Sequence, residues 1–91
     1  MAKEVKVLIT DPVGLYATPV TELVDTVKIF NCHVHLFYNE KEVNMKSMMG
    51  VLSLGIPSKA HIIIKADGVD EDSAISAIEE KIKSTGIGDI L

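Results

Sequence analysis

Apolar and polar residues alternate along several short stretches of the chain, and a period of two is typical of strands that bury one face. Four strands are predicted on this basis, over residues 4–10, 32–38, 41–44 and 60–66. Their inward-facing side chains are predicted to be Val5, Val7, Ile9, Cys32, Val34, Leu36, Ile62 and Ile64. Asn39 and Glu40 should form a tight hairpin turn between the second and third strands, although Gly is the more usual second residue of such a turn.

A helical spacing of apolar residues follows the first strand. The helix is predicted to begin at Pro19, since proline suits the first helical position, with Tyr16 or Thr18 as its cap. Ile29 and Phe30 are expected to close the core behind this helix. Its buried stripe should consist of Val20, Leu23, Val24 and Val27.

Two further helices are predicted from their end signals. One lies between a capping Ser47 and a terminating Gly55, and the other between a capping Asp70 and a terminating Gly86. The last helix should bury Ala74, Ile75, Ile78 and Ile82, and the apolar tail of residues 87–91 either packs down or frays. The element order indicates an α+β fold, in which an antiparallel sheet carries its helices on one face.

The length, charge and residue composition of the chain exclude some classes of function. A chain of 91 residues allows a single domain over residues 1–91, and it carries a net charge of −4 with nine basic residues, all of them lysine. The absence of Arg argues against nucleic-acid binding, because Arg supplies the planar fork used for phosphate and base contacts. No apolar stretch approaches the length of a membrane span, and the single Cys32 excludes an internal disulfide, so we expect a cytoplasmic protein.

The segment from Asn44 to Gly55 has the most distinctive chemistry. It places the hydroxyl of Ser47 at a helix N-terminus, where a phosphate would be favoured. Its apolar side chains are too many for one buried stripe on so short a helix, so some should face water and form a docking surface. We expect Val51 and Leu54 to be buried, and the surface set to be Met48, Met49 and Leu52.

Other candidate sites carry less weight. His33 and His35 share one strand face, but two imidazoles without a nearby Cys or carboxylate in sequence make a weak metal site, so we predict neither a metal nor a cofactor. His61 is expected on the surface of another strand. Cys32 falls on an inward face and is expected to be a buried, inert thiol.

Three segments resemble the HPr family, the histidine-containing phosphocarriers of the bacterial sugar phosphotransferase system. Residues 44–55 are similar to the regulatory-serine signature of that family, residues 13–19 to its active-site motif Gly-(Ile/Leu)-His-Ala-Arg-Pro, and residues 66–74 to its turn into the last helix. The resemblance covers essentially the whole chain. It implies an open-faced sandwich of four antiparallel strands under three helices.

The active-site motif departs from the family pattern. Tyr16 stands where the family has its phosphorylatable His, and Thr18 stands where it has Arg, while Gly14, Ala17 and Pro19 are retained. A tyrosine phosphoester is too stable to pass its phosphoryl group on readily, and a phenol is a weak nucleophile unless it is activated. Thr18 supplies no charge for a transferring phosphate. The phosphohistidine role is therefore not assigned to this chain, and no catalytic residue is predicted.

The resemblance implies a regulatory protein of the Crh-like class, which keeps the serine and lacks the phosphocarrier His, although the usual Crh motif keeps the Arg. In the family, a serine kinase/phosphorylase modifies the residue matching Ser47, and the phosphoprotein is corepressor for a LacI-type catabolite regulator. The implied docking face comprises Tyr16, Ala17, Val20, Thr21, Met48, Met49 and Leu52. The alternatives are a phosphocarrier with a replaced active site that works with enzyme I or sugar permease subunits, and an assembly part without signalling.

Overall fold

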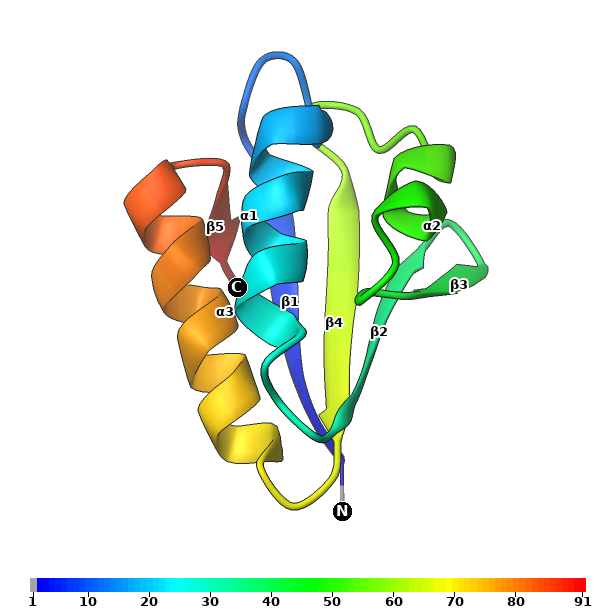
Figure 1. The fold of residues 1–91 in the computed structure, drawn as a ribbon. Helices are drawn as coiled ribbons and strands as arrows, with labels where there is room; N and C mark the ends of the chain where they lie inside the picture. Colours follow the sequence, from blue (N-terminus) through cyan, green and yellow to red (C-terminus); the bar gives the residue numbers. More distant parts are fainter. Residues whose placement is uncertain (1) are drawn as a thin grey trace.

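The computed structural model describes residues 2–91, which form one antiparallel sheet with helices packed against one of its faces (Figure 1). Across these residues the sheet has five strands in the order β3-β2-β4-β1-β5. The central strand, β4, pairs with β1 from Ala2↔Asp67 to Leu8↔His61 and with β2 from His33↔Asp67 to Phe37↔Ile63. The strands are β1 (Ala2–Ile9), β2 (His33–Tyr38), β3 (Lys41–Asn44), β4 (His61–Asp67) and β5 (Gly88–Ile90).

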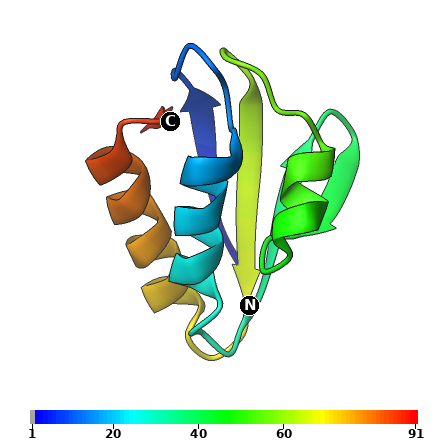
Figure 2. The ribbon, with the colours of Figure 1, turned by 45° about the horizontal axis from the view of Figure 1, so that its top comes forward.

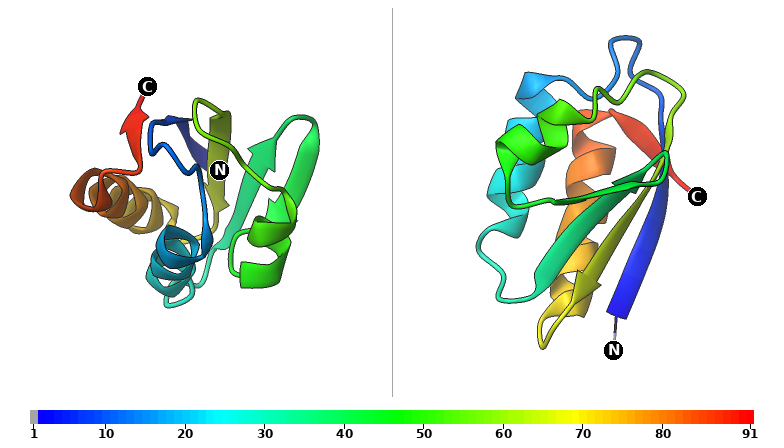
Figure 3. Two further views of the ribbon diagram at one scale, coloured as in Figure 1. Left: turned by 90° about the horizontal axis from the view of Figure 1, so that it is seen from above. Right: turned by 90° about the vertical axis from the view of Figure 1, so that its right-hand side faces the viewer.

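The helices are α1 (Ala17–Val27), α2 (Met48–Ser53) and α3 (Glu71–Thr85). They lie together on one side of the sheet, as the two turned views show, and leave the opposite face open (Figure 3). α1 and α3 lie side by side, while the short α2 lies on the side of β2 and β3 (Figure 2). No helix among residues 2–91 is long and apolar enough to cross a membrane.

The core fills the layer between sheet and helices, and it confirms the periodicities read from the sequence. The predicted inward side chains of the strands are buried, as are the stripes of α1 and α3. Asn39 and Glu40 both have positive φ. The hairpin turn therefore forms with Glu at the position where Gly is usual. Gly55 and Gly86 end their helices in the left-handed conformation, as predicted.

The prediction of four strands was wrong by one. Residues 88–90 form β5 and pair with β1 in the register Val7↔Ile90, Leu8↔Asp89 and Ile9↔Gly88. Gly88 permits this close approach, because a Cβ there would lie 2.6 Å from the Leu8 carbonyl oxygen. The tail therefore packs down, in a strand too short to show an alternating pattern.

Two details of α1 also differ from expectation. The helix begins at Ala17, so Pro19 occupies its third position, where a backbone N–H has no helical partner to lose. Ile29, expected to close the core, is 77% exposed, because it lies beyond the end of α1 at Val27 and no longer follows the buried stripe of the helix. Phe30 is partly buried against the core, as expected.

Asp70 occupies the predicted cap position of α3 but makes no cap hydrogen bond with its side chain. Its carboxylate instead accepts hydrogen bonds from the backbone N–H groups of Asn31 at 2.7 Å and Cys32 at 2.9 Å. The side chain thus joins the turn before α3 to the loop between α1 and β2.

Candidate functional site at the N-termini of α1 and α2

Ser47 caps α2 as predicted. Its backbone is extended, and its Oγ accepts a hydrogen bond from the N–H of Gly50 at 3.1 Å. Gly50 leaves room for this side chain, since a Cβ at Gly50 would lie 3.3 Å from the Ser47 Oγ. Sequence reasoning missed this role of Gly50, although a glycine three residues after a cap was the available signal. Ser47 is exposed.

The apolar side chains of α2 divide between the core and the surface. Val51 is buried as predicted, whereas Leu54 is only half-buried. Met49 is 78% exposed, and Met48 and Leu52 are half-buried against the edge of the core. The exposed apolar surface beside Ser47 therefore centres on Met49, with Met48 and Leu52 forming its partly buried base.

The N-terminus of α1 is held by the loop that precedes β4. The N–H of Leu15 donates to the carbonyl oxygen of Ile56 at 2.9 Å. Gly14 has positive φ and passes so close to this loop that a Cβ there would lie 2.5 Å from the same oxygen. Tyr16 then occupies the cap position, 41% exposed, with no cap hydrogen bond from its side chain. Ala17 and Thr18 are exposed beside it.

α1 and α2 are in contact, and Thr21 of α1 meets Met48 at the start of α2. The Thr21 Oγ1 lies 2.8 Å from the Ala17 carbonyl oxygen and 3.5 Å from the Met48 Sδ. A hydroxyl has one proton to donate, and the shorter contact to the stronger acceptor takes it, so the sulfur contact is packing. Of the predicted docking face, Thr21 and Met48 are in contact across the two helices, and Tyr16, Ala17 and Met49 are exposed.

Val20 does not belong to this face. It is fully buried, and its N–H donates to the Tyr16 carbonyl oxygen in the first turn of α1. The prediction that Val20 takes part in docking was wrong, because its position on the helix faces the sheet together with Leu23 and Val27.

The histidines lie away from the α1 N-terminus. His33 and His35 on β2 and His61 on β4 are on the open face of the sheet, since their neighbours Val34, Leu36 and Ile62 are buried on the helical side. The fold therefore places no imidazole beside Tyr16. The start of α1 therefore offers a hydroxyl and apolar contacts, and the start of α2 offers the hydroxyl of the serine that caps it.

Cys32 is buried, as predicted from its strand face. Burial raises the pKa of its thiol, and the hydrogen bond to the Asp70 carboxylate adds to that effect. A thiol with a raised pKa is a poor nucleophile, which agrees with an inert structural role.

Residues 3–84 match the family model described as the phosphorylation site of the HPr component of the phosphotransferase system. The chain belongs to the HPr family. A histidine-containing phosphocarrier protein from Mycoplasma is 36% identical, with 96% of this chain and 99% of that chain covered and a TM-score of 0.93. HPr-C-His from Thermoanaerobacter tengcongensis is also 36% identical, with 90% and 92% covered and a TM-score of 0.84.

Crh of Bacillus subtilis, described as a catabolite repression protein, is also similar. It is 30% identical, with 80% of this chain and 84% of that chain covered and a TM-score of 0.70. These likenesses confirm the HPr-type open-faced sandwich. HPr proteins are phosphocarriers of the phosphotransferase system and not catalysts.

Proposed function

We propose that this HPr-family protein is regulatory, that phosphorylation of Ser47 switches it, and that it carries no phosphohistidine. The observation that carries the proposal is the contrast between the two N-termini. Ser47 is an exposed cap residue whose side chain already accepts a hydrogen bond from the Gly50 N–H. Tyr16 occupies the position of the family's active-site His, and no imidazole lies beside it.

The geometry at Ser47 suits a phosphate. Its Oγ already accepts the Gly50 N–H, so a phosphoserine keeps an acceptor at the positive end of α2. The phosphate adds close to two negative charges and acceptor oxygens without requiring the helix to move. The switch then acts by changing the charge beside Met49, which remains exposed for a partner.

The partners follow from this chemistry and from the family. A serine kinase/phosphorylase of the HPr type would modify Ser47, and a LacI-type catabolite regulator would bind the modified face in the cytoplasm. The partner's cationic side chains would pair with the phosphate, while Met48, Met49 and Leu52 supply an adaptable apolar surface. Tyr16 adds an aromatic anchor at the edge of that surface.

Phosphosite mapping by mass spectrometry tests the proposal. One sample receives ATP and the serine kinase, and the other receives phosphoenolpyruvate and enzyme I. We expect phosphate on Ser47 in the first sample and none in the second, with Ser47→Ala as the matched control. Phosphate on Tyr16 or on a histidine in the second sample would reject the regulatory assignment.

A phosphocarrier role is the second candidate, because the scaffold of the active-site motif is intact at Gly14 and Pro19. The double variant Tyr16→His, Thr18→Arg separates the two functions. Transfer from enzyme I to this variant, but not to the parent chain, would show a docking face that has lost only its chemistry. Transfer to the parent chain would establish the carrier instead.

A further inference from the structure

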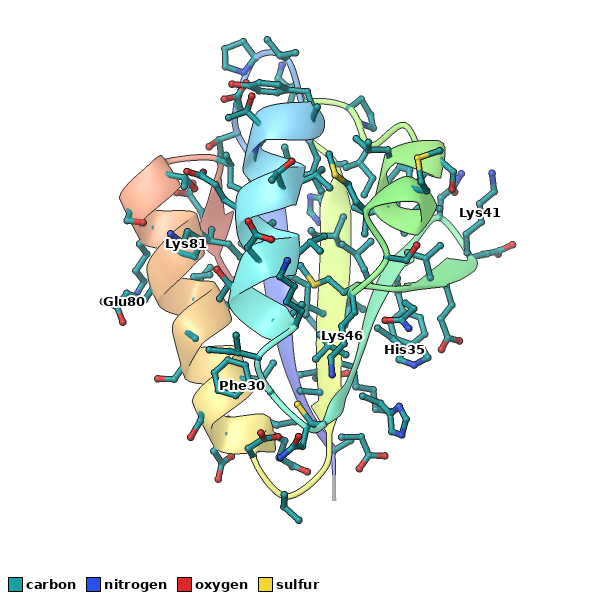
Figure 4. All side chains as sticks on the ribbon, in the orientation of Figure 1. Phe30, His35, Lys41, Lys46, Glu80 and Lys81 are labelled. Carbon is teal, nitrogen blue, oxygen red and sulfur yellow. The ribbon has the colours of Figure 1, made fainter. Side chains whose placement is uncertain are left out.

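The open face of the sheet contains a hollow that the proposed function does not use. Its volume is about 390 Å³, and it is lined by His33, His35, Phe37, Glu42, Lys65 and Asp67. These residues come from β2, β3 and β4, on the side that the helices leave uncovered. Figure 4 shows His35 near the β2–β3 hairpin, away from α1 and α3.

Glu42 determines which nitrogen of His35 is free. Its Oε2 is hydrogen-bonded to the Nδ1 of His35 across the β2–β3 pair. An ionised carboxylate can only accept, so Nδ1 carries the proton and the lone pair of the neutral ring lies on Nε2. A carboxylate that holds one ring nitrogen while the other faces a ligand is the usual support of a metal-binding histidine.

The second imidazole and a further carboxylate lie in the same hollow. His33 is two residues from His35 on the same strand face, and its Cα register partner across the β2–β4 ladder is Asp67. Both His33 and Asp67 are exposed, so their side chains are free to turn. From the sequence alone the histidine pair lacked a carboxylate; the fold supplies two, from β3 and β4.

We propose that His33 and His35 bind one divalent transition-metal ion of the Zn²⁺ type, with Asp67 as an oxygen ligand and Glu42 as the positioning residue of His35. Imidazole nitrogen suits Zn²⁺, Ni²⁺ and Cu²⁺. As placed among residues 2–91, no group of three or more His, Cys, Asp or Glu side chains could hold a metal ion, so binding requires His33 and Asp67 to rotate toward the ion. The proposal does not depend on Ser47 or Tyr16.

The charged side chains within the hollow predict how substitutions should change the affinity for the metal ion. Glu42 and Asp67 contribute two carboxylates, and Lys65 contributes one ammonium opposite His35 in the β2–β4 register. That ammonium repels a bound cation. Removal of the Lys65 charge should therefore strengthen metal binding, a result that a merely structural role for these residues would not produce.

Calorimetric titration of the purified chain with Zn²⁺ tests the site, and Ni²⁺ broadening of backbone NMR signals locates it. We expect one saturable ion per chain, with broadening centred on residues 33–35 and 65–67. His33→Gln and His35→Gln should each abolish saturable binding, Glu42→Gln should weaken it about tenfold, and Lys65→Gln should tighten it. His61→Gln is the matched control, since His61 lies in a neighbouring hollow of the same face.

Thermal unfolding of each variant verifies that it is folded before it is titrated. Saturable binding that survives His33→Gln, or that His61→Gln abolishes, would overturn the assignment. The absence of saturable Zn²⁺ binding in the parent chain would overturn it as well. Unchanged affinity in Glu42→Gln would refute the positioning role of Glu42.

Discussion

The N-termini of α1 and α2 differ in what their cap residues do. At α2, the Ser47 side chain bonds the Gly50 N–H, and Gly50 leaves space for it. At α1, Tyr16 stands at the cap with no such bond, although the loop beneath it is closely fitted at Gly14.

The difference shows that a close backbone fit does not require a side-chain bond at the cap: Gly14 is closely fitted although Tyr16 makes no cap bond. The bond from the Leu15 N–H to the Ile56 carbonyl and the close approach of Gly14 involve backbone atoms and not the side chain at position 16. Function lies in the side chains that such a scaffold presents. Substitutions at the scaffold glycine and at the cap residues separate the two contributions.

Gly14→Ala tests the scaffold and should have the largest effect. Gly14 has positive φ, and a Cβ there would meet the Ile56 carbonyl oxygen at 2.5 Å. We therefore expect a loss of about 3 kcal/mol in the free energy of unfolding. Gly55→Ala is the matched control, because Gly55 also has positive φ but no atom lies close to its missing Cβ. It should cost about 1 kcal/mol. Urea unfolding measures both, and equal losses would contradict the close approach.

Val20→Ala tests the boundary between the docking face and the core. Val20 is fully buried, whereas Met49 is exposed. Removal of the Val20 methyl groups should cost about 2 kcal/mol through lost burial and a residual cavity. Met49→Ala should change the free energy of unfolding by only about 0.5 kcal/mol. Under the proposed function, it should instead weaken binding of the Ser47-phosphorylated protein to the catabolite regulator. A Met49→Ala variant that unfolds as easily as Val20→Ala would refute this division.

Ser47→Ala tests the cap directly, because it removes the Oγ acceptor of the Gly50 N–H. The loss should cost about 1 kcal/mol in the free energy of unfolding. Ser47→Asp keeps an acceptor at the same position and should restore most of that loss. The Tyr16 side chain makes no cap bond, so Tyr16→Phe should leave the free energy of unfolding close to that of the parent chain. Chemical denaturation of the three variants would contradict the comparison if Tyr16→Phe cost as much as Ser47→Ala.

The sequence predicted those parts of the fold that repeat a local pattern. The strand faces on β2 and β4 and the buried stripe of α3 follow from spacing alone, and the structure confirms them. The α2 cap at Ser47 was predicted because it needs only a neighbour three residues away. β5 was missed because three residues carry too little pattern to distinguish a strand from a tail.

Val20 and Asp70 show two other reasons for error. The helical spacing placed Val20 in the buried stripe while the family likeness placed it on the docking face, and the spacing was right. At Asp70 the residue type suited a cap, but its partners lie 39 and 38 positions away in the chain. No local pattern reveals such a contact, just as none brought Glu42 and Asp67 to the histidines of β2.

Asp70 stands at a third helix N-terminus, and its carboxylate bonds the loop between α1 and β2 instead of capping α3. The hydrogen bond from the Asn31 N–H holds the pKa of the Asp70 carboxyl below its ordinary value of 3.8, and the hydrogen bonds from the Cys32 thiol and N–H add smaller effects in the same direction. A lowered folded-state pKa gives stability that is present above the ordinary value and is lost as the pH falls through the folded-state value. The free energy of unfolding should therefore decrease as the pH falls below about 4.

Asp70→Asn should lower stability at neutral pH and flatten this acid dependence, since an amide keeps one acceptor but cannot be protonated in this range. Ser47→Ala should lower stability by a similar amount at every pH, because its cap bond involves no titrating group. Urea unfolding between about pH 2.5 and 7, a range that brackets the ordinary carboxyl pKa of about 4, measures both slopes. A parent-like acid slope in Asp70→Asn would show that other carboxylates cause the loss and that the Asn31 contact does not depend on charge.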